Sequence, residues 1–453
     1  MIYINTYNHH QTFISSACVR IFTIRKMEAL QVRTLDLWPR ESRNIIQAKG
    51  IREEKLRRKF SEVIFPWDDN YDQRRMLFST QIQERPLFII VVHEVSDISR
   101  TLSLVSRYQL SLRVVGGRHS TIAQNPQVFL DMQNLDRIVI KKKVLQVGAG
   151  ATQGEVNHFL FTHGLCLSFG HASHPSSMSF PGGSAVSVGV AGITMSGGIG
   201  TLRRTLGLAI DSVVGFDVVV PVDPNVRPGK VNRCREIHTN NEVNPDLFWA
   251  LKGGGPYYGI VTQIYYRVKL VPSVITYSVS WPWDSARMVL EKWLRTSPNR
   301  SNKFNEDLAI YTDARKAYIE LSGIYVLGKK ESEFQARDAV KNELQSLPHG
   351  KLMISGEQQY SSVYTNLAKG RKYHSYSVAK TILTVQCPSS ETLSLLFGII
   401  DSMIRASTDD TTGKFYLGWQ LMGGRISDND NSAFYLRQAK FFVDIFNFWD
   451  DIA

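Results

Sequence analysis

Cysteine is scarce in this chain of 453 residues, which contains four, at positions 18, 166, 234 and 387, and no CxxC pair. Such spacing excludes a small disulfide scaffold and is typical of free thiols in a reducing compartment, although one long-range disulfide remains an alternative. Long apolar runs are also missing, since no stretch reaches the roughly 18 residues that a membrane span needs. We therefore expect a cytoplasmic protein without a membrane span, with secretion as an alternative.

Charge of either sign is moderate, because charged residues make up 21% and hydrophobic residues 43% of the chain. This composition excludes a disordered or collagen-like chain, and the length predicts two or three domains. The net charge of +12 favours an anionic partner such as a phosphate-bearing cofactor. The basic residues form only short runs, at 57–59 and 141–143, and no nucleic-acid motif accompanies them. We expect no nucleic-acid partner.

The first 26 residues contain three basic residues and no acid. They lack the apolar region of a secretory signal, which leaves a mitochondrial transit peptide or a disordered extension, with Met27 as an alternative start. We assign residues 1–60 to a partly disordered N-terminal extension.

The middle of the chain is expected to be α+β. Apolar runs and helical spacing predict one domain over 61–272, with strands at 87–92, 112–115, 128–132, 137–140, 144–149, 213–220 and 260–270 and helices at 95–109, 153–163 and 246–251. A second domain over 273–422 is predicted to contain an antiparallel sheet covered by helices, with strands at 274–281 and 308–327 and helices at 283–295, 330–345 and 389–404. Residues 423–453 are interpreted as a segment that returns to the first domain.

Acidic residues are absent between Glu155 and Asp211, a gap of 55 residues. Within this gap lies a glycine-rich segment, 182–200. Glycine lets backbone N–H groups approach a ligand, and donors without nearby carboxylates suit pyrophosphate oxygens or a planar ring. A structural turn rich in glycine is the alternative.

Two further segments combine a strand with glycines. Residues 113–120 predict a strand that enters a Gly-Gly turn followed by Arg118 and His119, and residues 247–262 contain three consecutive glycines before a strand. Turns of this kind can bind phosphate through their amides, although His119 alone is compatible with an ordinary turn.

Other motifs are weaker or absent. Residues 148–154 approach the dinucleotide fingerprint, but the spacing is GxGxxxG and no acid follows near 20 residues on, which argues against a nicotinamide site. The histidines at 158, 163, 171 and 174 have no Asp or Glu at the usual metal-ligand spacing, and Cys166 has no second cysteine nearby. We therefore expect no metal site. The chain has no GxSxG and no HExxH, which argues against serine hydrolases and zinc proteases.

Taken in order, these segments resemble the FAD-linked oxidases of the vanillyl-alcohol oxidase / p-cresol methylhydroxylase superfamily, in the berberine-bridge-enzyme-like branch. The matching segments are 113–120, 186–200, 203–220, 246–262 and the C-terminal pair 423–425 and 432–437. The resemblance implies a two-subdomain PCMH-type FAD-binding domain and a substrate domain whose antiparallel sheet covers the flavin ring.

The cofactor implied by the resemblance is FAD. His119 stands where many members bond the flavin covalently, whereas Ala185 stands where a second, cysteinyl link would be. The other cofactor-binding residues implied are Val115, Gly116, Gly117, Arg118, Ser120, Val188, Gly189, Gly192, Ile193, Ser196, Gly197, Gly198, Gly200, Ile260 and Val261.

The sequence also departs from the family pattern. Arg118 replaces a usual glycine, Leu436 replaces a histidine, and 171–185 resembles an insertion. Gln420 stands where relatives place a polar or acidic active-site residue, and Tyr416 is the second catalytic candidate. The tyrosine-bearing segment that supplies a base in many relatives is not found in the sequence.

The resemblance implies an oxidase for a small molecule, in which hydride passes from an alcohol or activated C–H to flavin N5 and oxygen becomes peroxide. The flavin supplies the redox chemistry. Val188, a small residue at a position linked to oxygen use, favours molecular oxygen as acceptor. The alternatives are a catalytically impaired binding or scaffold protein and a dehydrogenase with another acceptor. No motif names the substrate or the oligomeric state.

Overall fold

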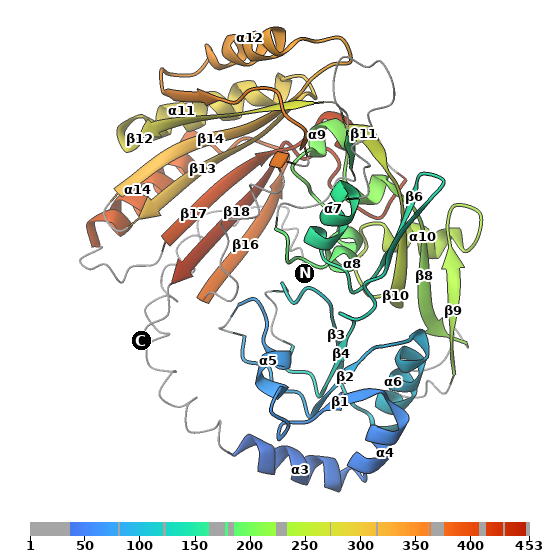
Figure 1. The fold of residues 1–453 in the computed structure, drawn as a ribbon. Helices are drawn as coiled ribbons and strands as arrows, with labels where there is room; N and C mark the ends of the chain where they lie inside the picture. The colour runs from blue at the N-terminus through green and yellow to red at the C-terminus, as the bar shows by residue number, and fades with distance from the viewer. Residues whose placement is uncertain are drawn as a thin grey trace.

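The structure is a computed structural model that describes residues 37–79, 82–120, 124–162, 177–179, 185–222, 233–271, 273–313, 316–360, 362–363, 376–406, 414–428 and 431–449. Two bodies are visible (Figure 1). One contains two small sheets and the other a single large sheet.

The first small sheet has the strand order β1-β2-β4-β3. Strands β2, β4 and β3 are parallel, and β1 is antiparallel to β2. All four side chains of β2 are buried, as its continuous apolar run predicts. The strands are β1 (Glu62–Ile64), β2 (Phe88–Val91), β3 (Leu112–Val115) and β4 (Val128–Asp131).

Helix α6 (Val95–Tyr108) covers this sheet, and its start is determined by a capping box. The Asp97 carboxylate accepts hydrogen bonds from the backbone N–H groups of His93 and Glu94, at 3.0 and 3.2 Å. Ile98, Leu104 and Val105 on its inner face are buried. Among the described residues, three helices come before β2 in the chain, namely α3 (Trp38–Ala48), α4 (Glu53–Lys59) and α5 (Tyr71–Arg75).

The second small sheet is antiparallel, with the order β5-β6-β10-β8-β9. It shares one hydrophobic core with the first sheet, because Ile90 and Leu130 belong to the same buried cluster as Val147, Phe216 and Ile264. Its elements are β5 (Ile138–Lys141), β6 (Val144–Gly148), α7 (Gln153–Thr162), α8 (Val190–Met195), α9 (Arg203–Leu206), the 3-10 turn η2 (Ala209–Asp211), β8 (Val213–Pro221), β9 (Cys234–Thr239), α10 (Pro245–Leu251) and β10 (Ile260–Arg267).

A two-stranded pair follows, in which β11 (Lys269–Val271) lies antiparallel to β7 (Ser177–Ser179). The long strand predicted over 260–270 is therefore two strands.

The second body is built on a seven-stranded antiparallel sheet with the order β15-β12-β14-β13-β17-β18-β16. The single strand predicted over 308–327 was wrong: the chain turns back so that Asp313 and Lys316 are opposite each other in register. The strands are β12 (Val274–Pro282), β13 (Phe304–Asp313), β14 (Lys316–Val326), β15 (Lys351–Ile354), β16 (Tyr376–Thr384), β17 (Lys414–Leu421) and β18 (Phe441–Trp449).

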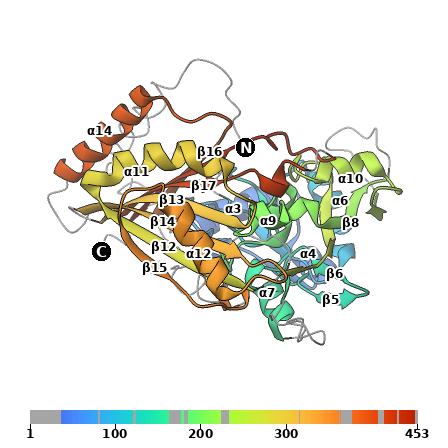
Figure 2. The ribbon, with the colours of Figure 1, turned by 90° about the horizontal axis from the view of Figure 1, so that it is seen from above.

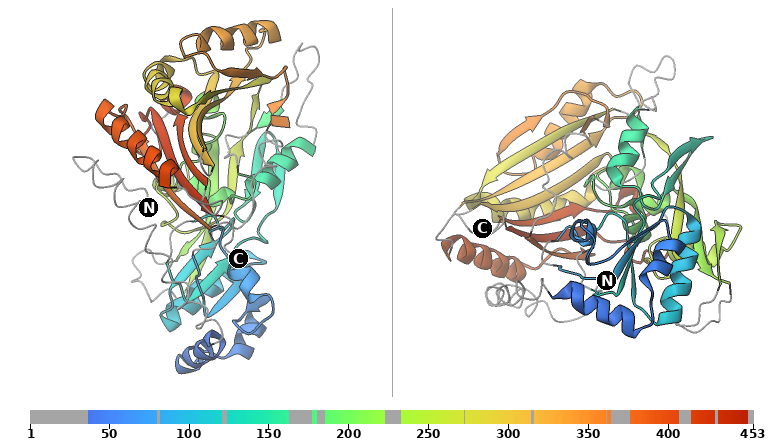
Figure 3. Two further views of the ribbon diagram at one scale, coloured as in Figure 1. Left: turned by 90° about the vertical axis from the view of Figure 1, so that its left-hand side faces the viewer. Right: turned by 60° about the horizontal axis from the view of Figure 1, so that its bottom comes forward.

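Helices cover one face of this sheet, and none of the helices among the described residues packs along its other face. Leu308, Ile319 and Trp419 pack with Val289 and Leu393 in one buried cluster. The covering helices are α11 (Trp283–Thr296), with η3 (Ser297–Asn299) after it, α12 (Glu333–Leu344) and α14 (Ser390–Ala406). They lie on the side away from the first body (Figures 2 and 3). We call the opposite surface, which carries Tyr311, Tyr416 and Gln420, the open face.

The segment predicted to return to the first domain contributes to both bodies. The turn η4 (Gly424–Ile426) packs against α9, because a Cβ at Gly424 would lie 2.6 Å from the Arg204 carbonyl oxygen. Strand β18 instead pairs with β17 and β16 inside the large sheet.

Candidate functional site

Two of the glycine-rich segments meet in backbone contact. A Cβ on Gly117 would lie 2.0 Å from the Gly189 nitrogen and 2.7 Å from the Ser187 oxygen, and a Cβ on Gly189 would lie 2.6 Å from the Gly117 nitrogen. Only two glycines permit this approach. The fold therefore brings the end of β3 against the segment that leads into α8.

His119 lies at this junction. Its Nε2 forms a 2.7 Å hydrogen bond with Ser187 Oγ, and its ring stacks on Phe78 with centroids 4.2 Å apart. The Phe78 backbone N–H donates to the carbonyl oxygen of Arg118 at 3.0 Å. The hydrogen bond to Ser187 and the stacking on Phe78 both restrain the orientation of the imidazole.

Arg118 has φ 60°, in the left-handed region that favours glycine. A left-handed φ is easy for glycine and costly for residues with a Cβ, which explains why glycine is usual at this turn position. The guanidinium forms an ion pair with Asp131, whose side chain is fully buried, and Arg74 also reaches Asp131 at 3.3 Å. The positive charge of Arg118 is consequently compensated inside the protein.

The weak dinucleotide-like motif has a structural role. A Cβ on Gly148 would lie 2.1 Å from the Leu135 oxygen, and one on Gly150 would lie 1.8 Å from the Met132 oxygen. Within the same motif, the backbone N–H of Gln153 donates to Val188 O at 2.9 Å. These glycines permit tight packing that supports the segment at 188–190.

The third glycine segment meets the C-terminal motif. Gly197 and Gly253 have φ values of 107° and 108°, and a Cβ on either would lie 2.6 Å from Phe434. Arg437 forms an ion pair with Asp211 at 2.8 Å, and both side chains are largely buried. The motifs that are far apart in sequence therefore converge on one region.

Helix α9 connects this region to the large sheet. Arg203 and Arg204 are almost fully buried. Arg203 donates to Leu421 O at 2.8 Å and pairs with Asp307, while Arg204 donates to the carbonyl oxygens of Arg300 and Phe304 at 2.8 and 3.0 Å. Burial lowers the pKa of Arg204 to about 10, so the guanidinium is charged at neutral pH. Its charge-assisted hydrogen bonds link the two bodies.

The two catalytic candidates share the open face of β17. Gln420 and Tyr416 are four residues apart, which places them roughly 13 Å apart along the strand. Gln420 lies beside Leu421, the residue that accepts from Arg203, and its Nε2 donates to Asp444 Oδ2 at 2.6 Å. Tyr416 packs between Tyr311 and Phe446. Gln420 therefore lies at the end of β17 that is next to α9, whereas Tyr416 lies nearer the start of the strand.

Asp444 is the functional candidate that the sequence analysis missed. Asp444 lies on β18 and is 5% exposed. The strand alternates apolar residues toward the helices with Phe442, Asp444 and Phe446 toward the open face. In the sequence, an acidic residue within an aromatic strand was the signal that could have identified Asp444. Its partner Gln420 could be identified only once β18 was seen to pair with β17.

The described residues fit a flavin cofactor beside this junction. A Cβ on Gly192 would have nothing within 4 Å, and one on Gly116 would meet only Ala149 O at 3.6 Å, so the backbone there is accessible. The side-chain amide of Gln153 is fully buried, and within the described residues it has no hydrogen-bond partner. An accessible backbone without carboxylates and an unpaired buried amide suit an anionic, planar ligand.

The remaining predicted cofactor residues are distributed around the same region. Val115 and Val261 are buried in strands, Ser120 and Ser196 are exposed, and Val188, Ile193 and Ile260 are half-buried. Gly198 packs on Ala209 with no room for a Cβ, and Gly200 is buried. Their contact with a cofactor stays a prediction.

Among the residues that the structure describes, no three His, Cys, Asp or Glu side chains gather as a metal site would need. Within the same ranges, no helix has the length and apolar character to cross a bilayer. His163, Cys166, His171 and His174 lie outside the described residues.

Comparisons with known proteins agree with this geometry. Residues 86–223 match the FAD binding domain family. The chain is 28% identical over 251 residues to the uncharacterized FAD-linked oxidoreductase YgaK of Bacillus subtilis, covering 54% of this chain and 51% of the relative. It is 26% identical over 315 residues to reticuline oxidase of Papaver somniferum, covering 65% and 54%. The chain thus spans about half the length of these curated relatives.

Solved structures confirm the fold. Physcomitrella patens BBE-like 1 superimposes with a TM-score of 0.69 at 22% identity, over 86% of this chain and 82% of that one. These findings confirm the α+β fold class and an FAD binding domain over residues 86–223, with FAD as the cofactor, and they show relatives among the berberine-bridge-enzyme-like oxidoreductases. The covalent flavin, the domain boundaries and the individual site residues stay predictions.

Proposed function

From the premise that this chain carries an FAD binding domain and is related to the berberine-bridge-enzyme-like oxidoreductases, we propose that it is an FAD-dependent oxidase of a small molecule. The observation that carries the proposal is the contact between the Gly117 and Gly189 turns beside His119, with accessible backbone next to it. FAD bound there would supply the redox chemistry, taking hydride from an alcohol or activated C–H and passing electrons to oxygen.

The protein side of the reaction is assigned to the open face at its junction with the first body. Because Asp444 accepts from Gln420 Nε2, the Gln420 Oε1 is left as an acceptor for a substrate hydroxyl. Asp444 is the carboxylate that would take up the proton released from that hydroxyl. Tyr416 lies farther along β17 and would contact a more distant part of the substrate.

The test of the cofactor assignment is the visible spectrum of the purified protein before and after acid precipitation. Flavin bands with colour retained in the pellet are expected for the wild type, and release of the colour is expected for His119→Ala. His238→Ala is the matched control, because His238 lies on β9 and bonds Asp217, away from the junction. A colourless protein that FAD does not reconstitute would refute the proposal.

The electron acceptor is tested separately. After reduction of the bound flavin with dithionite, rapid reoxidation in air with formation of peroxide is expected for an oxidase. Val188 lies next to Ser187 at the junction, where a larger side chain is expected to slow the oxygen reaction. Slow reoxidation in air together with fast reoxidation by a quinone would establish a dehydrogenase instead.

A further inference from the structure

The ring of Tyr416 lies along β17, over Gly418. A Cβ on Gly418 would be 2.2 Å from the Tyr416 hydroxyl oxygen and 2.5 Å from its Cζ. Any residue other than glycine at position 418 would therefore collide with the ring. Because residue 418 is halfway between 416 and 420 on the strand, the Tyr416 hydroxyl lies closer to Gln420 than its own α-carbon does.

Two aromatic rings hold Tyr416 in this orientation. Phe446 and Tyr311 are opposite Tyr416 on the two neighbouring strands, β18 and β13. Their ring centroids lie 5.8 and 5.3 Å from that of Tyr416. Since both flanks of the ring are occupied, it is restrained to the direction along the strand. Tyr416 is half-buried, so part of its ring stays accessible to a substrate.

An acidic residue lies directly across from Gly418. This residue is Asp444, which is opposite Gly418 in the register of β17 and β18. Opposite side chains point to the same face of a sheet, with Cβ atoms about 5 Å apart. The Tyr416 hydroxyl occupies the place of a side chain at 418 and therefore faces the Asp444 carboxylate. Gln420 Nε2 already donates to Oδ2 of this carboxylate at 2.6 Å, so three polar groups converge on the open face.

The other face of the same sheet contains a complete example of this arrangement. Gly323 is opposite both Tyr277 and Glu306, and a Cβ on Gly323 would lie 2.1 Å from Tyr277 Cζ. The Tyr277 ring crosses the glycine, and its hydroxyl donates a hydrogen bond to Glu306 Oε1. In this sheet, a tyrosine that folds over a glycine thus reaches the acid opposite that glycine.

We propose that Tyr416 is a positioning residue for the base, because its hydroxyl donates a hydrogen bond to the Asp444 oxygen that Gln420 does not bond. Gly418 makes this hydrogen bond possible. Burial favours the neutral form of a carboxyl group, and Asp444 is 5% exposed. Two donated hydrogen bonds favour the carboxylate, the form that can take a proton from a substrate hydroxyl. The role in catalysis rests on the proposed function, whereas the hydrogen bond does not.

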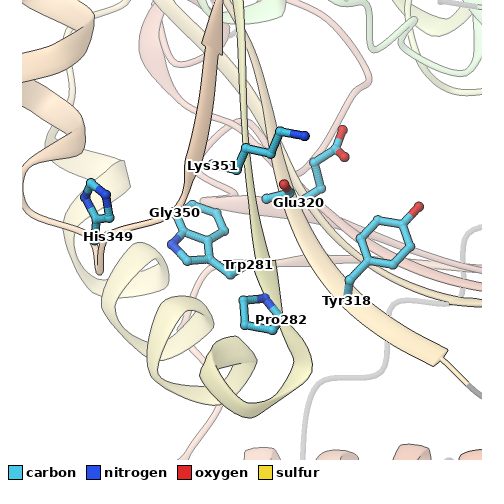
Figure 4. Close-up of a pocket in the computed structure, with 8 residues that line it drawn as sticks. Trp281, Pro282, Tyr318, Glu320, His349, Gly350 and Lys351 are labelled. Carbon is cyan, nitrogen blue, oxygen red and sulfur yellow. The ribbon is translucent and has the colours of Figure 1, made fainter.

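Other charged groups on the open face are farther from Asp444. Its opposite neighbour on β16 is Thr381, which is uncharged. In its own row across the sheet, the first charged residue is Glu320, three strands away or roughly 14 Å, with Lys351 beyond it (Figure 4). In the adjacent row, Asp307 lies two strands away, and its charge is paired with an arginine of α9. A titration sensed at the tyrosine hydroxyl is therefore expected to be that of Asp444.

Fluorine NMR of the full chain tests the hydrogen bond. Incorporation of 3-fluorotyrosine gives each tyrosine a resonance, and Tyr416→Phe identifies that of Tyr416. This resonance is expected to shift with pH as Asp444 takes up a proton, and the shift is expected to be lost in Asp444→Asn. The resonance of Tyr257, which is 76% exposed, is the internal control and should have the same pH dependence in both proteins.

Thermal unfolding measures the same hydrogen bond without a label. Tyr416→Phe is expected to lower the melting temperature of the wild type by about 2–4 °C, and to cause no further loss in the Asp444→Ala protein. Gly418→Ala displaces the ring, so the pH-dependent shift of the Tyr416 resonance should disappear. Gly398→Ala is the matched control, because nothing lies within 4 Å of the Cβ position there, and it should leave that shift unchanged.

Two results would overturn the proposal. One is a Tyr416 resonance with the same pH dependence in the wild type and in Asp444→Asn, and the other is an equal effect of Tyr416→Phe with and without the Asp444 carboxylate. Neither measurement needs the flavin. A protein that shows the coupling but does not bind FAD would uphold the hydrogen bond and refute the oxidase, whereas bound FAD and peroxide formation without the coupling would do the reverse.

Discussion

Substitution of Gly117 by alanine is the most direct perturbation of the glycine junction. The new Cβ would lie 2.0 Å from the Gly189 nitrogen, whereas an ordinary contact needs at least 3.4 Å, and the atoms in the way are backbone atoms. The two turns must therefore separate. Overpacking costs about 1–3 kcal/mol, which for a domain of this size lowers the melting temperature by roughly 3–10 °C. The His119–Ser187 hydrogen bond should be lost with the displacement.

Thermal unfolding followed by tryptophan fluorescence, together with FAD titration, measures both consequences. Gly398→Ala is the control, because Gly398 lies in α14 with nothing within 4 Å of its Cβ position; it is expected to stabilise the helix by about 0.5–1 kcal/mol. Gly192→Ala separates the two effects, since space is open there: folding is retained, and only FAD affinity should fall. A wild-type melting temperature in Gly117→Ala would refute the contact.

Three further outcomes follow from the same structure. Arg204→Met removes three hydrogen bonds to carbonyl oxygens, two of them buried, and should lower the free energy of unfolding by about 3 kcal/mol in urea denaturation; an unchanged midpoint would contradict the role of α9 in linking the two bodies. Arg118→Gly relieves a left-handed φ that costs about 1 kcal/mol but removes a partner of buried Asp131, so the larger loss should dominate and net destabilisation of about 1–3 kcal/mol is expected by the same assay. Although burial acts to raise it, the pKa of Glu331 is lowered by hydrogen bonds from Lys303, Tyr325 and a backbone N–H. The resulting stability is present above the unfolded pKa of about 4.3 and is lost as the pH falls through the lower folded value; Glu331→Gln should flatten this acid limb, and an identical limb would refute the assignment.

Where local sequence patterns predicted an element, its bounds were often accurate to within a few residues, but several elements, among them β9, β15, β16 and β18, were not predicted. The strand expected at 112–115 is Leu112–Val115, and the helix expected at 95–109 is Val95–Tyr108. Both signals are local, because continuous apolar runs and helical spacing reflect burial of the element's own side chains. The strand expected over 308–327 was wrong because the charged stretch at 313–316, which separates two apolar strands, was not interpreted as a turn.

These local patterns could not predict which strands, distant in sequence, lie side by side in a sheet. Strand β18 lies between β17 and β16, and Asp444 reaches Gln420 only through that order. Nothing within 441–449 specifies which strand lies beside it, since backbone hydrogen bonding is the same for every neighbour. The carboxylate next to the predicted catalytic residue was therefore missed.

Two properties of the cofactor region can be read directly from the sequence: the lack of acidic residues between Glu155 and Asp211, and the glycines at positions 117 and 189. The tertiary structure alone decided that these glycines touch and that His119 meets Ser187 across 68 residues of chain. A glycine allows two backbone segments to come close together, but it does not specify which segments will meet. That specificity comes from the shared core of the two small sheets and from the buried arginines of α9, which only the folded chain brings together.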